Sequence, residues 1–171
     1  MSTKTDCHFN IPVNWSIDDY KKLDYKLDHH KGNEDNKKYI EAGHLTQSLT
    51  LYNYFEPNPM PNSIEYIKSY FNLKNMSVAV NLFTPGQYIP IHYDRYSAYK
   101  QVHRLNDDSN IGRYIVMLED SYPGQMLQIN NDIYNNWSAG DVFGWINDTV
   151  HTFYNLSVYN RYAVQITGEL Y

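Results

Sequence analysis

The 171-residue sequence contains a single cysteine, Cys7, and no long apolar segment. One cysteine excludes an internal disulfide and any zinc site built from several cysteines. No apolar run approaches the length that crosses a bilayer, and the first ten residues lack the apolar centre of a secretory signal. We therefore expect a cytoplasmic protein that makes no contact with a membrane.

The sequence also lacks an excess of positive charge. Its formal net charge is −5 and its pI is near 5.7. Proteins that bind nucleic acids or membrane surfaces usually present a basic face, so we expect neither kind of partner. The partner that we expect is a substrate, either a small molecule or a peptide or protein.

Aromatic residues, in contrast, are abundant. The 18 tyrosines raise the aromatic share to 16%, and hydrophobic residues make up 42% of the chain. A chain of this length and composition can bury a core, which argues against disorder. No repeat or low-complexity linker divides the sequence, so we predict one domain over residues 1–171.

The sequence pattern changes near residue 75. Before that point, Ser16 with Asp19 and Asn62 with Glu65 resemble capping boxes that precede apolar residues at helical spacing. We predict that residues 1–75 are helical or irregular and cover one outer face of a sheet.

After residue 75 the chain consists of short runs rich in β-branched and aromatic residues. These runs are residues 77–83, 113–119, 126–130, 141–145, 151–156 and 161–168. Turn signals such as Thr84-Pro85-Gly86 separate them, which predicts a β-sandwich or barrel and most simply a jelly roll. The predicted fold class is mainly β, with N-terminal helices ahead of a jelly-roll core over residues 76–171.

Two polar residues in this β region are candidate metal ligands. His92 and Asp94 are two positions apart, so on an extended strand both project to the same face. Such a pair alone is typical of a solvated strand end. His151, which follows a turn and begins another run, supplies a third candidate. Two histidines and one carboxylate on one face match the ligand set of non-haem Fe(II) oxygenases, which leaves open positions on the metal.

Arg161 is the candidate anion-binding residue. It lies ten residues after His151, and no acid occupies the alternating positions of its own run, Ala163 and Gln165. A guanidinium on the inner side of a small barrel keeps its charge and needs an anionic partner. A ligand carboxylate could supply two parallel hydrogen bonds. The alternative for this residue is an arginine at the surface or in a salt bridge.

The motif His92-x-Asp94 with His151 and Arg161 resembles the Fe(II)- and 2-oxoglutarate-dependent dioxygenases, whose fold is a double-stranded β-helix, a jelly roll of the cupin kind. NLFTPGQYIPIH (81–92) is similar to the stretch before the first histidine in aspartyl/asparaginyl β-hydroxylase-like members, of bacterial and viral type. Residues 140–168 resemble their Gly-Asp…His…Arg block. The animal β-hydroxylases of this group lack the carboxylate ligand that Asp94 supplies here.

The resemblance implies a role for each site residue. It implies Fe(II) ligation by His92, Asp94 and His151, binding of the 2-oxoglutarate 5-carboxylate by Arg161 with help from Asn81, and contact of Arg113 with the 1-carboxylate or the substrate. It further implies hydroxylation of a C–H bond in a protein side chain or an amino-acid-like molecule, with consumption of O2 and release of succinate and CO2. The alternative is a cupin-like or lectin-like jelly roll that binds a metal or a sugar without oxidation, which has no need of a buried arginine.

Three further interpretations concern the surroundings of this site. The long segment 93–112 shows weak periodicity, so it is expected to be a lid or substrate-binding loop, or else a merely solvated loop. Its basic residues could attract an acidic substrate group; they are Arg95, Lys100, His103 and Arg104. Trp145 and Phe153 are expected to line the pocket or to pack in the core.

Overall fold

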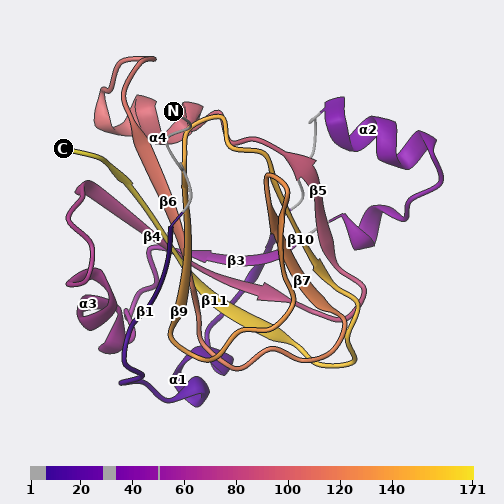
Figure 1. Ribbon diagram of the computed structural model, residues 1–171, viewed down its shortest axis with the longest axis horizontal. Coiled ribbons are helices and arrows are strands. Elements are labelled where there is room, and N and C mark those ends of the chain that lie inside the picture. The colour runs from indigo at the N-terminus through magenta and orange to yellow at the C-terminus, as the bar shows by residue number, and fades with distance from the viewer. Residues whose placement is uncertain (1–6, 29–33, 50) are drawn as a thin grey trace.

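The computed structural model describes residues 7–28, 34–49 and 51–171, which form two facing antiparallel sheets (Figure 1). The strands are β1 (Cys7–Asn10), β2 (Lys26–Asp28), β3 (Leu51–Phe55), β4 (Lys74–Phe83), β5 (Tyr88–His92), β6 (Ile111–Met117), β7 (Gln125–Ile129), β8 (Asp132–Tyr134), β9 (Asp141–Ile146), β10 (His151–Asn155) and β11 (Arg161–Glu169). The helices are α1 (Ile17–Lys21), α2 (Glu34–Glu41), α3 (Ser63–Lys68) and α4 (Ser97–His103), with a 3₁₀ turn η1 (Thr46–Ser48).

The order of the strands identifies the architecture. One sheet has the order β1-β9-β6-β11-β4-β3-β2 and the other the order β5-β10-β7-β8. The strands from β4 to β11 therefore place four members in each sheet, and the chain crosses repeatedly between the two sheets. This arrangement is the double-stranded β-helix, a jelly roll, as the sequence predicts.

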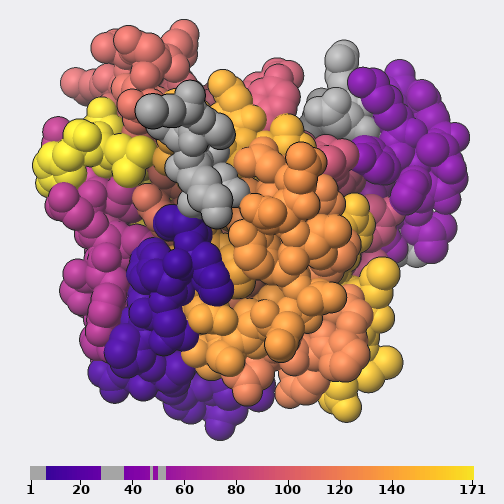
Figure 2. Space-filling view, viewed as in Figure 1, coloured from indigo at the N-terminus to yellow at the C-terminus, as the bar shows by residue number. Residues whose placement is uncertain are grey.

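The first 75 residues differ from the prediction. Besides helices they contain β1, β2 and β3, which extend the larger sheet at both of its edges: β1 pairs with β9, and β3 pairs with β4 and β2. The helical spacing of Tyr20, Leu23 and Leu27 predicts that the first helix reaches Leu27, but Leu27 lies in β2 instead. Edge strands this short carry little periodicity, because three or four residues cannot repeat an alternation clearly. Figure 2 shows the N-terminal part, in indigo, packed against the C-terminal half, in orange.

Two of the helices pack on the outer face of the larger sheet. Ser16 caps α1, since its hydroxyl accepts a hydrogen bond from the Asp18 amide at 3.3 Å. Tyr20 of α1 and Ile64 and Ile67 of α3 are fully buried in a core cluster that includes Val80, Val164 and other residues of the sheet. The helices thus shield one face of the sheet and leave its inner face for the site.

A second core cluster fills the space between the two sheets. It contains Phe83, Leu127, Phe143, Phe153 and Ala163, drawn from both sheets. In β11, alternation sends Ala163 to this inner cluster and its neighbour Val164 to the outer one. Polar residues that interrupt the inner cluster are therefore placed between the sheets. No helix in the described part of the chain is long and apolar enough to cross a membrane.

Candidate metal centre and anion pocket

The antiparallel pairing of β5 with β10 brings the two candidate histidine ligands together. His92 ends β5, His151 begins β10, and the two residues are direct partners in the ladder. Their ring centroids are 4.3 Å apart. Asp94 lies two residues after the end of β5, so its carboxylate is at the same end of the sandwich as the two histidines.

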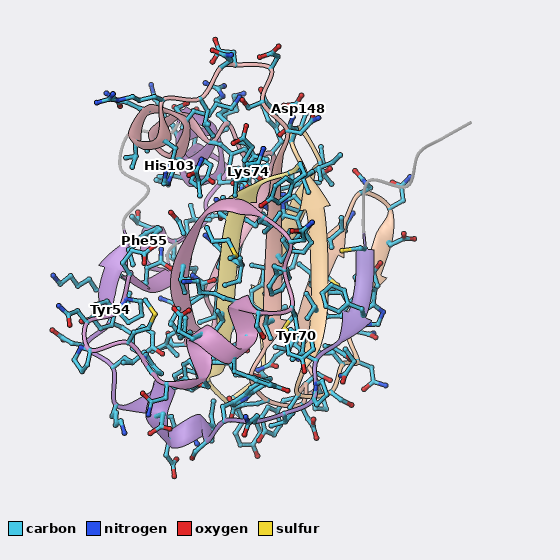
Figure 3. The ribbon with its side chains drawn as sticks, turned by 90° about the vertical axis from the view of Figure 1, so that its left-hand side faces the viewer. Tyr54, Phe55, Tyr70, Lys74, His103 and Asp148 are labelled. Atoms are coloured by element: carbon cyan, nitrogen blue, oxygen red, sulfur yellow. The ribbon has the colours of Figure 1, made fainter. Side chains whose placement is uncertain are left out.

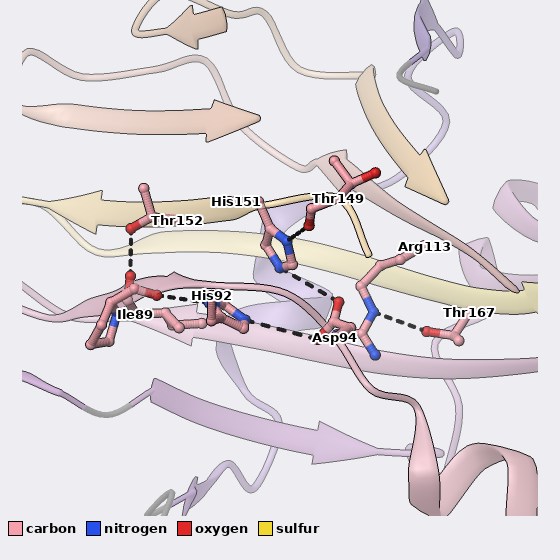
Figure 4. Close-up of polar contacts among 9 residues, drawn as sticks. Ile89, His92, Asp94, Arg113, Thr149, His151, Thr152 and Thr167 are labelled. Carbon is pink, nitrogen blue, oxygen red and sulfur yellow. Dashed lines mark hydrogen bonds and ion pairs between the residues drawn. The ribbon is translucent and has the colours of Figure 1, made fainter. Parts of the chain in front are cut away.

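The ligating atoms of the three side chains face one another (Figure 4). The Nε2 atom of His92 lies 3.8 Å from Asp94 Oδ1, and that of His151 lies 3.5 Å from Asp94 Oδ2. The Nδ1 atoms point away, to the carbonyl oxygens of Pro90 at 2.7 Å and of Thr149 at 2.9 Å. Because Nδ1–H donates to a carbonyl in each case, the lone pair of Nε2 faces Asp94.

The electrostatics of the group favour the protonation states that a metal requires. Burial acts to raise the pKa of Asp94, but Arg113 and the two histidines outweigh it and hold the pKa below its ordinary value. Burial lowers the pKa of His151 to about 4. Asp94 is thus ionised and His151 neutral at neutral pH, and these are the states in which both bind metals.

A buried carboxylate oxygen without a hydrogen-bond partner indicates that the three candidate ligands fit a cation. Asp94 Oδ2 is buried and has no hydrogen-bond partner among the described residues. The candidate ligand atoms of His92, Asp94 and His151 all lie within 4.8 Å of one another. One divalent ion at roughly 2.0–2.2 Å from nitrogen and oxygen ligands would satisfy this oxygen. The cluster can therefore hold a metal ion.

Two further donors beside Asp94 lack partners. The hydroxyl of Tyr96 and the indole N–H of Trp145 are both buried and unbonded within the described chain. Burial, partly offset by Arg113 and reinforced by Asp94, raises the pKa of Tyr96 above its ordinary value, so the hydroxyl keeps its proton. Trp145 also packs on His151, with ring centroids 4.3 Å apart. Sequence reasoning missed Tyr96, because its left-handed backbone (φ 53°) is not encoded by its residue type.

Removal of the Tyr96 hydroxyl tests its proximity to the metal ligands. The hydroxyl has no partner among the described residues, and we expect it to donate to Asp94 once a metal binds. Tyr96→Phe should therefore weaken Co(II) binding about 10-fold, the lower end of the range for hydrogen bonds to ligating carboxylates. The measurement is a titration followed by the Co(II) absorption spectrum. Tyr93→Phe is the matched control, since Tyr93 is 47% exposed. Equal affinities for the two variants would show that the Tyr96 hydroxyl does not support Asp94.

Arg161, the first residue of β11, is buried in an aromatic box. Its guanidinium carbon lies 3.5 Å from the ring centroid of Phe153, and 5.4 and 5.5 Å from those of Phe83 and Trp137. One Nη donates to the sulfur of Met117 at 2.9 Å, and Nε has no partner in the described chain. Burial lowers the pKa of Arg161 to about 9, which still leaves it charged at neutral pH.

No ion pair in the described ranges involves Arg161. Aromatic faces and a thioether compensate a buried charge only in part. Arg161 is therefore a buried cation without an acidic partner among the described residues.

Arg161 and the three candidate metal ligands line the same cavity, which has a volume of about 250 Å³. All six candidate site residues line it, namely Asn81, His92, Asp94, Arg113, His151 and Arg161. Trp145 and Phe153 line the cavity and also belong to the inner core cluster, so both interpretations of these two aromatic residues hold.

The two remaining candidates make contacts that the sequence did not predict. Asn81 donates its amide to the side-chain oxygen of Asn53, on the neighbouring strand β3. Arg113 donates from Nη1 to Asp94 Oδ1 at 2.8 Å and from Nε to the hydroxyl of Thr167 at 3.4 Å. Arg113 thus contacts the candidate carboxylate ligand directly. Asn53 could not be identified from the sequence, because it lies on a strand that was not predicted.

Segment 93–112 is not the irregular loop that we expected, because it contains α4. None of its basic residues lines the metal cavity. Lys100 donates to the carbonyl of Asp107, the Arg95 guanidinium lies 5.9 Å from the Tyr93 ring, and His103 lies 3.5 Å from the Ser77 hydroxyl.

No protein-family model and no curated protein matches the chain. Among solved structures, a prolyl-4-hydroxylase from Pseudomonas putida matches with a TM-score of 0.55 and 11% identity, over 91% of this chain and 97% of that one. A putative sugar phosphate isomerase from Acidithiobacillus ferrooxidans matches with a TM-score of 0.51 and 13% identity, over 92% and 75% of the two chains. At such identities these matches show a shared fold and nothing about shared activity.

Proposed function

We propose that this protein is an Fe(II)- and 2-oxoglutarate-dependent oxygenase that hydroxylates a C–H bond. The proposal is supported by the His92–Asp94–His151 cluster and by the buried guanidinium of Arg161 in the same cavity. The substrate class that we propose is a protein side chain or an amino-acid-like molecule. The resemblance of residues 81–92 to aspartyl/asparaginyl β-hydroxylase-like proteins is the reason for this choice.

Each side chain has a defined task in this proposal. The three ligands would hold the iron, and the carbonyls of Pro90 and Thr149 would fix the orientation of the two imidazoles. Bound iron would supply the redox chemistry with O2 that converts 2-oxoglutarate to succinate and CO2 while one oxygen atom enters the substrate C–H bond. Arg113 would hold the Asp94 carboxylate, whose Oδ1 it already contacts at 2.8 Å.

Arg161 would bind the distal carboxylate of 2-oxoglutarate. Its guanidinium can donate two parallel hydrogen bonds to a carboxylate, and the aromatic rings around it exclude water, which strengthens such a pair. Asn81, on the same cavity wall, could donate a further hydrogen bond once its contact with Asn53 rearranges.

The single observation that carries the proposal is the buried Arg161 without an acidic partner. A jelly roll that binds only a metal or a neutral sugar would leave this charge uncompensated inside the molecule, at a cost of several kcal/mol. A dicarboxylate that reaches from the metal to Arg161 removes that cost.

Anaerobic titration tests this proposal directly. Addition of Fe(II) and 2-oxoglutarate to the full chain is expected to produce the visible charge-transfer band of the chelate and to raise the melting temperature. Succinate, which cannot chelate the metal in the same way, serves as the control and should give no band. The absence of both the band and a 2-oxoglutarate-dependent rise in melting temperature would exclude the proposed activity.

A further inference from the structure

A second cavity, of about 210 Å³, adjoins the metal cavity. Phe55, Arg113 and Gln165 line both cavities, so the two lie side by side with these three side chains between them. The remaining walls of the second cavity come from β4, β11, α4 and Glu56, which directly follows β3. Figure 3 views the molecule from this side and shows Phe55, at the end of β3, and His103, at the end of α4. A group in the second cavity therefore lies next to the candidate metal centre.

Exposed apolar side chains face this cavity from two elements. Phe55 on β3 is 61% exposed, and Val102 on α4 is 74% exposed. Ala98 lies one helical turn before Val102 and lines the same cavity. Apolar surface left in water on two walls of one cavity gains free energy when an apolar group covers it.

Helix α4 is fixed on β4 in the orientation that creates these walls. The hydroxyl of Tyr99 donates to the carbonyl of Asn75 at 2.7 Å, and the His103 ring nitrogen lies 3.5 Å from the Ser77 hydroxyl. The polar residues of the helix thus anchor it to the larger sheet, while Ala98 and Val102 remain on the cavity side.

The charged groups that line the second cavity make polar contacts within the chain. Glu56 accepts a hydrogen bond from the amide of Val78 at 2.8 Å, and Arg113 donates to Asp94 at 2.8 Å. His103, the remaining titratable group apart from tyrosine, contacts Ser77. An anionic ligand group would find no unpaired arginine or lysine among the described residues of these walls, whereas an uncharged group needs no counter-ion when it enters.

We propose that the second cavity binds an uncharged apolar group of the substrate, of the size of a phenyl ring or a leucine side chain. An apolar cavity of roughly 150 Å³ accepts benzene, so about 210 Å³ accommodates one such group. This inference rests on the proposed oxygenase function and narrows its substrate to an amino-acid-like molecule with an apolar side chain. The bond to be oxidised then lies on the part of the molecule that extends past Arg113 and Gln165 toward the metal.

The test uses toluene as a probe of the full chain loaded with diamagnetic Zn(II) and 2-oxoglutarate. Methyl NMR signals of Ala98 and Val102 are expected to shift and saturate as toluene is added. Val102→Asp is expected to weaken toluene binding about 10- to 100-fold, since an apolar side chain on the cavity wall is replaced by a charge. Val158→Asp is the matched control; Val158 is 81% exposed, lines neither cavity and should leave toluene binding unchanged.

Two results would overturn this inference. One is a toluene titration that shifts no methyl signal of Ala98 or Val102; the other is tighter binding of benzoate or benzylamine than of toluene at these methyls. Binding of 2-oxoglutarate is measured on the same samples. If 2-oxoglutarate does not bind but toluene still shifts the Ala98 and Val102 methyl signals, the proposed function is contradicted, whereas the apolar binding site is supported.

Discussion

Replacement of Arg161 by methionine is expected to stabilise the ligand-free protein and to abolish tight binding of 2-oxoglutarate. Removal of one partner from a buried, hydrogen-bonded charge pair costs about 2–5 kcal/mol, so affinity for the cosubstrate should fall at least about 30-fold. In the ligand-free protein, the buried charge of Arg161 lowers the free energy of unfolding, because the described chain provides no acidic partner for it. Apolar replacement of buried charges stabilises proteins by about 1–4 kcal/mol in favourable cases.

The loss of the contact between Arg161 and Phe153 opposes this stabilisation. A desolvated cation–π pair contributes about 2 kcal/mol, whereas desolvation of an unpaired ion costs several kcal/mol, so the second effect dominates. Urea unfolding without ligand and isothermal titration with 2-oxoglutarate measure the two expected changes. Arg161→Lys is the matched control: it keeps the charge and loses the planar fork, and should therefore weaken cosubstrate binding without stabilising the chain. Undiminished cosubstrate affinity in the methionine variant would contradict the assigned role.

The jelly roll and the proximity of His92 to Asp94 were predictable from short-range patterns in the sequence. The two-residue period of strands separates the inner from the outer residues of β11. The two-residue spacing keeps Asp94 close to His92, although Asp94 lies just beyond the end of β5. The pairing of His92 with His151 across the sheet could not be read from either segment. It is a long-range contact that only the order of the strands determines.

The features that sequence reasoning missed depend on short elements and on backbone conformation. Asn53 reaches the cavity from β3, a strand in a region that seemed helical or irregular. Tyr96 and Arg104 flank α4 in left-handed conformations, which only glycine, and to a lesser degree asparagine and aspartate, makes recognisable in a sequence. The second cavity is lined by residues of β3, β4, β6, β11 and α4, which are far apart in the sequence, so no local pattern could have revealed it.

Substitution of Asp94 by asparagine is expected to lower Fe(II) affinity by at least about 100-fold. Loss of supporting contacts around metal ligands already costs 10- to 100-fold, and here the ligating charge itself is removed. The imidazoles of His92 and His151 would remain in place, since carbonyl oxygens orient them independently of Asp94. Anaerobic titration with Fe(II), followed by competition with a chelator of known affinity, measures the change.

Asp148→Asn is the matched control, because Asp148 is an exposed acid on the turn before β10 and lies outside the cluster (Figure 3). It should bind Fe(II) as the unaltered protein does. Comparison with Arg161→Met distinguishes metal binding from dicarboxylate binding. Asp94→Asn should lose affinity for Fe(II), whereas Arg161→Met should retain affinity for Fe(II) and lose affinity for 2-oxoglutarate. If Asp94→Asn bound Fe(II) with unchanged affinity, the carboxylate would serve only as the partner of Arg113, and the metal ligands would have to be sought elsewhere.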